Sequence, residues 1–335
     1  MDSSRGRLRG RGLRLGVLLA AAAVALSACA SGGGGDNGGG SDDGKGGDAN
    51  IKIRLVTNNT NSSLAAVVAD KKGFFADQGL DVELTPVADI SKVPQTLGNQ
   101  YDIGFGVEPL VIRGWSQGLK TVVIAGNGAS TEEAPFMVLM AKKGSGITSA
   151  KDMVGKRIAG PTLTGTHHIA TLYWLQKNGV EQSEVQSVQV ATPAMIDQLA
   201  QGQIDVAELQ EPYITEAKKQ GMEVVAFSSG AVAPKTIESL WITTPDWAKN
   251  NSEAIKRFRA ALDEAVSWME DSANESEAKG ILADFTKQDK ALVDQAPLLK
   301  YQVKVEPKDM EVWGVAMKAV TDFKADVDYS ELVLP

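Results

Sequence analysis

The sequence predicts an α/β protein of two lobes, which two crossover strands join and which enclose a ligand cleft. Segments typical of strands alternate with segments typical of helices, at a spacing of about 20 residues, and this favours a parallel or mostly parallel sheet. The alternation runs through two cycles, and a strand at 237–243 then returns the chain to the first lobe. We therefore assign residues 51–136 and 240–335 to lobe 1 and residues 137–239 to lobe 2, although a single large doubly wound domain would have a similar pattern.

The first cycle opens with a strand at 51–57, where apolar and polar residues alternate. Residues 64–72 have a helical pattern, which Ser62 or Ser63 can cap and which Gly73 ends. The remaining elements of this cycle are a strand at 81–87, a helix that begins at Ser91, and strands at 101–105 and 119–125.

The second cycle has the same order. After a strand at 135–142 and a short helix from Ser149, we expect strands at 156–160, 185–191, 204–208 and 222–227 and helices at 166–178, 193–201 and 211–220. From Pro245 the pattern is helical almost to the end, and we expect these helices to pack on lobe 1. The two crossings, near 136–142 and 237–243, form a hinge, and a hinge between two α/β lobes makes a cleft.

The N-terminus has the pattern of a signal peptide. Five arginines precede an uncharged apolar run at residues 15–26, which is shorter than the roughly 20 residues of a membrane-spanning helix. The run leads to Leu26-Ser27-Ala28-Cys29, which resembles the bacterial lipobox, whose cysteine receives a diacylglyceryl group. We therefore expect residues 1–28 to be removed and Cys29 to be lipidated. The alternative is an ordinary secreted protein with a cysteine at this point.

Residues 29–50 comprise this cysteine and a glycine-rich tether. They contain ten glycines and no large apolar side chain, so they cannot bury enough surface to offset the entropy of ordering. The body that follows has no cysteine, which excludes disulfides, thiolate metal sites and cysteine nucleophiles. The chain carries a net charge of −8, and −12 remains when the net +4 of residues 1–28 is removed. A body this acidic is not expected to bind nucleic acid.

Five segments occur in an order that is specific to one family. The longest reads KGFFADQGLDVEL at residues 72–84. The others are YDIGF at 101–105, GKRIAG at 155–160, PAM through QGQID at 193–205, and EPY at 211–213. Across residues 51–245 the chain resembles the substrate-binding proteins of the nitrate/sulfonate/taurine type, a family that also includes binders of a thiamine pyrimidine precursor.

This resemblance implies a type II periplasmic-binding-protein fold that closes on its ligand, with an ABC-type permease and its ATPase as partners. We therefore expect the extracytoplasmic solute-binding component of an ABC importer, which captures a small organic anion such as a sulfonate, taurine, nitrate or an aromatic acid. We also expect a monomer without a cofactor or a metal ion, which its lipid holds at the outer face of the cell membrane.

Polar turns follow several predicted strands, at the edge where open α/β sheets bind ligands and where helix N-termini offer N–H groups to anions. The turn at 164–166 matches the position of a Gly-Ser-Ser turn in sulfonate binders. The turn at 59–61 resembles an Asn-Thr-Asn turn of thiamine-precursor binders, which carry His where this chain has Ser62. The candidate ligand contacts are Asn59, Asn61, Ser62, Ser91, Thr164, Gly165, Thr166 and His167. The same residues can instead cap helices.

Two carboxylates favour a different ligand. Glu108 directly follows the strand at 101–105, and Glu211 opens a helix of lobe 2 in which Tyr213 can stack on a planar ring. If both carboxylates face the cleft, the ligand offers N–H donors, as an amine, an amidine or an aminopyrimidine does. Carboxylates are also favoured at helix starts without any ligand. Trp241 either walls the cleft or fills the hinge core, and we favour the core.

The other function classes have less support. The related folds include a cysteine-dependent desulfinase and fungal pyrimidine synthases, but the body has no cysteine and the fungal type lacks a lipobox. No spacing specifies a hydrolytic set of residues, so we expect no enzyme activity. A surface sensor, which binds a solute but serves a signalling partner, remains an alternative to transport.

Overall fold

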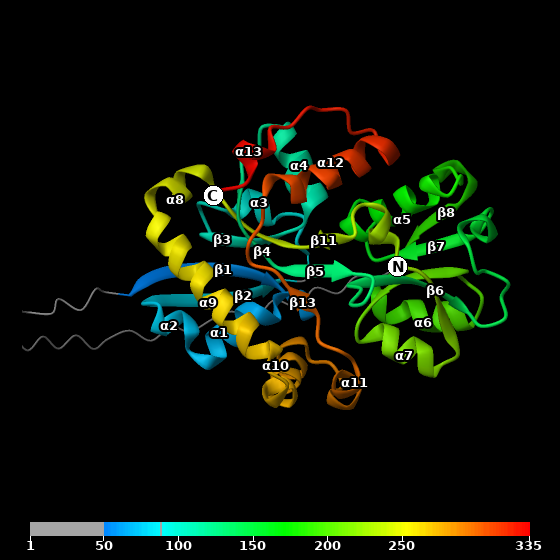
Figure 1. The fold of residues 1–335 in the computed structure, drawn as a ribbon, viewed down its shortest axis with the longest axis horizontal. Helices are drawn as coiled ribbons and strands as arrows, with labels where there is room; N and C mark the ends of the chain where they lie inside the picture. The colour runs from blue at the N-terminus through cyan, green and yellow to red at the C-terminus, as the bar shows by residue number, and fades with distance from the viewer. Residues whose placement is uncertain (1–49, 88) are drawn as a thin grey trace, which may run out of the picture. The chain divides into compact units, whose positions relative to one another are not determined.

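The computed structural model describes residues 50–87 and 89–335, which fold around two five-stranded sheets (Figure 1). We call the parts built on these sheets lobe 1 and lobe 2. The predicted signal peptide, lipidated Cys29 and tether fall on residues 1–49, outside the described residues.

The sheet of lobe 1 has the order β2-β1-β3-β12-β4. Its strands are β1 Ile51–Asn58, β2 Leu80–Val87, β3 Ile103–Gly106, β4 Val122–Gly126 and β12 Leu240–Thr243. β1 is parallel to β2 and β3, whereas β12 is antiparallel to both of its neighbours, β3 and β4. The sheet is therefore mixed, because β12 enters it from the other lobe.

The sheet of lobe 2 has the order β10-β6-β9-β7-β8. Its strands are β6 Met137–Lys142, β7 Arg157–Gly160, β8 Gln186–Gln189, β9 Val206–Gln210 and β10 Met222–Ala226. Here β7 is parallel to β8 and β9, and β6 is antiparallel to β9 and β10. In each lobe four of the five strands therefore run in one direction, and one strand, β12 or β6, runs antiparallel between them. The predicted class, two α/β lobes, is confirmed.

The crossings form a small sheet of their own, in the order β11-β5-β13. Its strands are β5 Gly128–Thr131, β11 Lys235–Ile237 and β13 Lys300–Tyr301. The chain runs through β5 toward lobe 2 and returns through β11, which pairs antiparallel with β5 (Figure 1). The strand expected at 237–243 is divided at Glu238 and Ser239 because the chain changes sheets there. Both residues bond to Gly128: the Glu238 amide donates to the Gly128 carbonyl, and the Gly128 amide donates to the Ser239 hydroxyl.

Helices cover both sheets. Lobe 1 has α1 Leu64–Lys72, α2 Phe74–Asp77, α3 Val93–Thr96 and α4 Glu108–Ser116, and lobe 2 has α5 Thr166–Lys177, α6 Thr192–Ala200 and α7 Tyr213–Lys219. The C-terminal helices are α8 Pro245–Asn250, α9 Ser252–Glu270, α10 Glu275–Thr286, α11 Lys290–Gln295, α12 Pro307–Val320 and α13 Tyr329–Leu332. The 3₁₀ turns are η1 Asn61–Ser63, η2 Ala150–Met153, η3 Gln182–Glu184, η4 Ser228–Ala231 and η5 Ser272–Asn274. The helix expected from Ser91 is only the single turn of α3.

The core of lobe 1 is closed by α9. This helix places a buried residue at every third or fourth position and packs on α1 and α2. Phe258 of α9 stacks on Phe75 with ring centroids 5.5 Å apart, and it meets the edge of Trp241 at 6.0 Å. Trp241 is fully buried, as expected for a core residue. α12 contacts both α4 and α5, so the C-terminal region touches both lobes.

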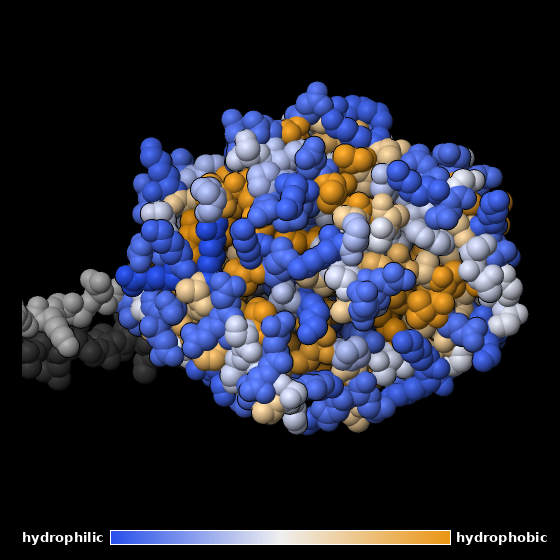
Figure 2. Space-filling model, viewed as in Figure 1, coloured by the Kyte–Doolittle hydropathy of each residue, from blue (hydrophilic) through white to orange (hydrophobic). Residues whose placement is uncertain are grey.

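The face of the molecule in Figure 2 is mostly hydrophilic, with smaller hydrophobic areas between the polar side chains. Among residues 50–87 and 89–335, none of the helices has the length and apolar character needed to cross a bilayer.

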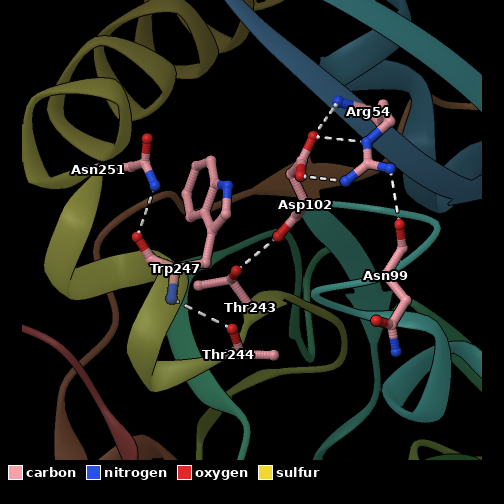
Figure 3. Close-up of polar contacts among 7 residues, drawn as sticks. All are labelled: Arg54, Asn99, Asp102, Thr243, Thr244, Trp247 and Asn251. Atoms are coloured by element: carbon pink, nitrogen blue, oxygen red, sulfur yellow. Dashed lines mark hydrogen bonds and ion pairs between the residues drawn. The ribbon is translucent and has the colours of Figure 1, made fainter.

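An arginine and an aspartate join neighbouring parallel strands in lobe 1 (Figure 3). Asp102, just before β3, accepts hydrogen bonds from the backbone N and Nε of Arg54 at 2.8 and 3.0 Å and from its guanidinium at 2.7 Å. The same guanidinium donates to the carbonyl of Asn99 at 2.7 Å. Burial acts to raise the pKa of Asp102, but these hydrogen bonds and the charge of Arg54 hold it below its ordinary value.

Lobe 2 contains the same clasp. Asp205, just before β9, accepts from the backbone N and Nε of Arg157 at 2.9 and 3.0 Å, and the guanidinium donates to the carbonyl of Gly202 at 2.7 Å. The clasps tie neighbouring parallel strands, β1 to β3 and β7 to β9, and they stand at the amino ends of β3 and β9.

We predict that Asp102→Ala and Asp205→Ala each lower the free energy of unfolding by about 1 kcal/mol. The lost hydrogen bonds are charge-assisted, but solvent screens the half-exposed arginines and so reduces the contribution of these bonds to stability. Urea unfolding measures the change. Asp322→Ala is the matched control, because Asp322 is highly exposed and pairs with Arg113 only at the surface. Losses no larger than in this control would contradict a structural role for the clasps.

Candidate functional site

A cavity of 210 Å³ lies where the carboxyl ends of β1, β3, β7 and β9 meet. This is the edge at which open α/β sheets bind ligands. Its volume is below the roughly 300–1,000 Å³ of pockets for drug-sized molecules, so it suits a ligand of about one ring. The lining residues from lobe 1 and the crossings are Asn58, Thr60, Ser62, Ile90, Phe105, Val107, Phe136 and Glu238. Those from lobe 2 are Pro161, Thr162, Gly165, Thr166, His167, Thr192, Glu208 and Gln210.

The turn after β1 is held in place by its own polar groups. The Ser63 hydroxyl donates to Asn58 Oδ1 at 2.6 Å, and the Ser62 amide donates to Thr60 Oγ1 at 3.3 Å. The Asn127 side chain donates to the carbonyl of Ser62 at 2.6 Å. Ser62, a predicted ligand contact, therefore lines the cavity in a fixed position.

The turn after β7 brings three predicted residues, Gly165, Thr166 and His167, into the lining. Gly165 precedes α5, and Thr166 is its first residue. The Thr166 hydroxyl donates across the lobes to Glu108 Oε2 at 3.3 Å. The His167 ring lies 5.3 Å from that of Phe136, tilted by 53°, and the two rings form an aromatic wall.

Glu108 is fully buried at the start of α4. Burial is the main cause that raises the pKa of this carboxyl well above its ordinary value, and the charge of Glu238 raises it further. Its Oε2 receives the Thr166 hydroxyl, whereas Oε1 has no hydrogen-bond partner among the described residues.

Glu208 is a lining residue that the sequence analysis did not select. It lies within β9, 1% exposed, and its Oε1 is 2.7 Å from Nδ1 of His168. Nε2 of His168 is 2.8 Å from the Ser187 hydroxyl, so this histidine is held from both sides. The second oxygen, Oε2, has no partner among the described residues. A Cβ at Gly160 would collide with this oxygen, so the glycine leaves room for the carboxylate.

Glu238 was also not selected from the sequence. It directly follows β11 and is 2% exposed. The Thr236 hydroxyl donates to its Oε1 at 2.9 Å, and its Oε2 lies 3.9 Å from Nε2 of His167, too far for a hydrogen bond. Oε2 is thus a third buried carboxylate oxygen without a hydrogen-bond partner in the described part of the chain.

Other predicted contacts lie away from this cavity. Asn61 and Glu211 line a separate void of 10 Å³, where the Asn61 side chain donates to the carbonyl of Glu211 at 2.7 Å across the lobes. Tyr213 is half-buried at the start of α7, and Asn59 and Ser91 are exposed.

Thr164 is exposed in an outer hollow of 490 Å³ that also touches Arg113 and Asp322. A second hollow, of 440 Å³, lies between α8, α9 and the C-terminus. Neither is lined by a buried polar atom that lacks a partner among the described residues, whereas Glu208 and Glu238 give the 210 Å³ cavity two. Because buried polar groups are normally paired, this unmet hydrogen-bonding capacity makes the 210 Å³ cavity the candidate ligand site. In residues 50–87 and 89–335 no three His, Cys, Asp or Glu side chains are placed to hold a metal ion.

The family model described as NMT1/THI5 like matches residues 60–276, more than half of the chain. The chain belongs to this family. The family resemblance read from the five sequence segments is thereby confirmed. A protein of Brucella abortus strain 2308 that is named a binding protein is 28% identical over 247 residues, which cover 72% of this chain and 74% of the relative. The taurine-binding periplasmic protein of Escherichia coli K12 is 26% identical over 212 residues, 62% of this chain and 64% of its own length.

Solved structures share the fold. The periplasmic aliphatic sulphonate binding protein of Escherichia coli superimposes with a TM-score of 0.71 at 15% identity, covering 85% of this chain and 92% of that one. The periplasmic nitrate-binding protein of Synechocystis PCC 6803 gives 0.68 at 15% identity, covering 84% and 86%. A Candida albicans protein described as having the generic periplasmic binding protein fold gives 0.62 at 12% identity, covering 85% and 95%. The expected periplasmic-binding-protein fold is confirmed.

We predict that Glu108→Gln stabilises the fold increasingly as the pH rises from about 5 to about 8. Because burial raises the pKa of Glu108, its contribution is fully present below the ordinary pKa of glutamate and is lost as the pH rises through the raised value. Glutamine cannot ionise and avoids this loss. Urea unfolding at several pH values measures the difference between the variant and the unmodified chain.

Glu223→Gln is the control, since Glu223 is exposed and 3.3 Å from Lys143. Its difference from the unmodified chain should stay near zero at every pH. A flat difference for Glu108→Gln as well would show that this carboxyl titrates normally.

Proposed function

We propose that this chain captures a small solute in the 210 Å³ cavity between its lobes and delivers it to the permease of an ABC importer. The observation that carries the proposal is the convergence of four strand ends, two from each lobe, on one cavity whose lining includes buried polar atoms that no described residue meets. A ligand that contacts both lobes favours the closed form, which a transporter can then recognise. The membership of the NMT1/THI5-like family supports this function.

The names of relatives support a small anion as the first candidate ligand. One is a taurine-binding protein, another a nitrate/nitrite-binding protein and a third a bicarbonate-binding protein. The N-terminus of α5 at the cavity adds support, because free N–H groups at helix starts favour negative charge. The buried carboxylates favour a second candidate, a nitrogen heterocycle.

We extend the proposal to the lack of an enzymatic reaction. The taurine-binding relative and the sulphonate- and nitrate-binding structures are named as binding proteins. Behind the lining, both ring nitrogens of His168 are engaged, one by the lining residue Glu208 and the other by Ser187. A solute sensor would use the same binding event.

A bulky side chain at the edge of the cavity should weaken solute binding. Thr162 lines the cavity but is itself exposed, so Thr162→Trp is expected to fold normally while weakening solute binding at least tenfold, about 1.4 kcal/mol. Calorimetry with a solute identified by a thermal-shift screen measures the affinity. Thr148→Trp, at an exposed threonine outside the hollows described above, is the control and should bind normally. Equal affinities of the two variants would place the solute elsewhere.

We also propose that a lipid on Cys29 anchors the protein to the outer face of the membrane. The lipobox-like Leu26-Ser27-Ala28-Cys29 supports this. Cys29→Ala should move the protein from the membrane fraction to the soluble fraction, because lipid chains supply the membrane affinity. Cell fractionation with immunoblotting checks the result, and Ser31→Ala, two residues beyond the cysteine, should leave the protein in the membrane fraction. Retention of the Cys29→Ala variant in that fraction would contradict the anchor.

A further inference from the structure

Three buried carboxyl groups surround one side of the cleft, and each has the same pattern of contacts. Glu108, Glu208 and Glu238 come from lobe 1, lobe 2 and the crossing, and each is at most 2% exposed. In each, one oxygen meets a hydroxyl or an imidazole of this chain, and the other has no partner among the described residues. Glu208 and Glu238 line the cavity directly, and Glu108 is bonded to its lining residue Thr166.

The described residues leave two carboxylate oxygens at the cavity, Glu208 Oε2 and Glu238 Oε2, without a hydrogen-bond partner. The described lining contains no lysine or arginine. Of the two histidines, His167 lies 3.9 Å from Glu238 Oε2, beyond hydrogen-bond distance, and His168 engages only Oε1 of Glu208. A metal ion is not indicated either, since the described side chains form no group that could ligate one. Buried polar atoms are normally hydrogen-bonded, so we expect a bound ligand to supply the donors that these two oxygens lack among the described residues.

The aromatic lining and the volume of the cavity indicate which kind of ligand it can hold. Phe105, Phe136 and His167 contribute aromatic side chains to the lining, and such rings favour cations and planar groups. The volume of 210 Å³ admits about one ring with substituents. Lone pairs of carboxylates accept N–H groups, and planar nitrogen cations place two such donors side by side.

On the basis of the proposed function, we propose that the captured solute is a small planar cation with several N–H donors, such as an amidinium or a protonated amino-heterocycle, bound between the carboxylates of Glu208 and Glu238. The two carboxylates belong to different parts of the chain, one to β9 of lobe 2 and the other to the crossing after β11. A cation that contacts both therefore ties lobe 2 to the hinge. The same carboxylates repel small anions, so of the two candidate ligands this inference keeps the nitrogen heterocycle and rejects the small anion.

Three ligands of one shape test this inference, because benzamidine, benzamide and benzoate differ mainly in charge. Calorimetry on the full-length chain at neutral pH measures their affinities, with taurine and nitrate as further anions. We expect benzamidine to bind at least tenfold more tightly than benzamide, and benzoate, taurine and nitrate not to bind. Preference for any of the anions would overturn the inference and leave solute capture standing. Failure of benzamidine to bind would also overturn the inference, whereas the thermal-shift screen and the Thr162→Trp variant test the proposed function separately.

Two variants connect the selectivity to the carboxylates. Glu208→Gln and Glu238→Gln preserve side-chain size and remove one charge, so each should weaken benzamidine binding at least tenfold and leave benzamide nearly unchanged. Glu223→Gln is the control, because Glu223 is exposed and outside the cavity lining. Its affinities should equal those of the unmodified chain. If the variants fold, as their thermal unfolding reports, and still bind benzamidine normally, the carboxylates do not recognise the cation.

Discussion

The chain passes between its lobes twice, and the two passages pair with each other as β5 and β11. Ile237 lies opposite Ala129 in this ribbon, and the next residues hold Gly128 through its amide and its carbonyl. Because both passages are tied together, the two sheets present their carboxyl edges to one cavity. Glu238 follows the ribbon directly, so the position of a ligand-facing carboxylate is set by the same hydrogen bonds that join the lobes.

Both lobes use the same arginine–aspartate contact to hold two neighbouring strands together. An arginine on one parallel strand clasps an aspartate just before its neighbour, at Arg54 and Asp102 in lobe 1 and at Arg157 and Asp205 in lobe 2. The clasps stand at the starts of β3 and β9, whereas the cavity lies at the carboxyl ends of these strands. They fix strand register at one end, which leaves the turns at the other end free to carry polar side chains for binding.

The sequence predicts the class of fold because strand and helix periodicity is a local property of the chain. It also predicts the polar turns of the cleft, because each of them comes directly after a predicted strand. Glu208 gave no such signal, since it lies inside an apolar strand, and Glu238 stands in a run that reads as one strand. The position of Glu208 depends on its contact with His168, 40 residues away in the sequence. The position of Glu238 depends on the point at which the chain changes sheets. The division of the chain into lobes at residues 136 and 239 remains a proposal, which the composition of the two sheets supports.

The buried carboxylates have a consequence for closure. In an open cleft, water can solvate Glu208 and Glu238, whereas closing the lobes removes that water and leaves each with one oxygen that no described residue meets. Direct hydrogen bonds from Thr166 to Glu108 and from Asn61 to Glu211 cross the lobes, and they favour closure. Desolvation of the carboxylates opposes it. A ligand that supplies N–H donors removes the opposing contribution and leaves the favourable one, so that closure becomes coupled to binding of a solute with the right charge.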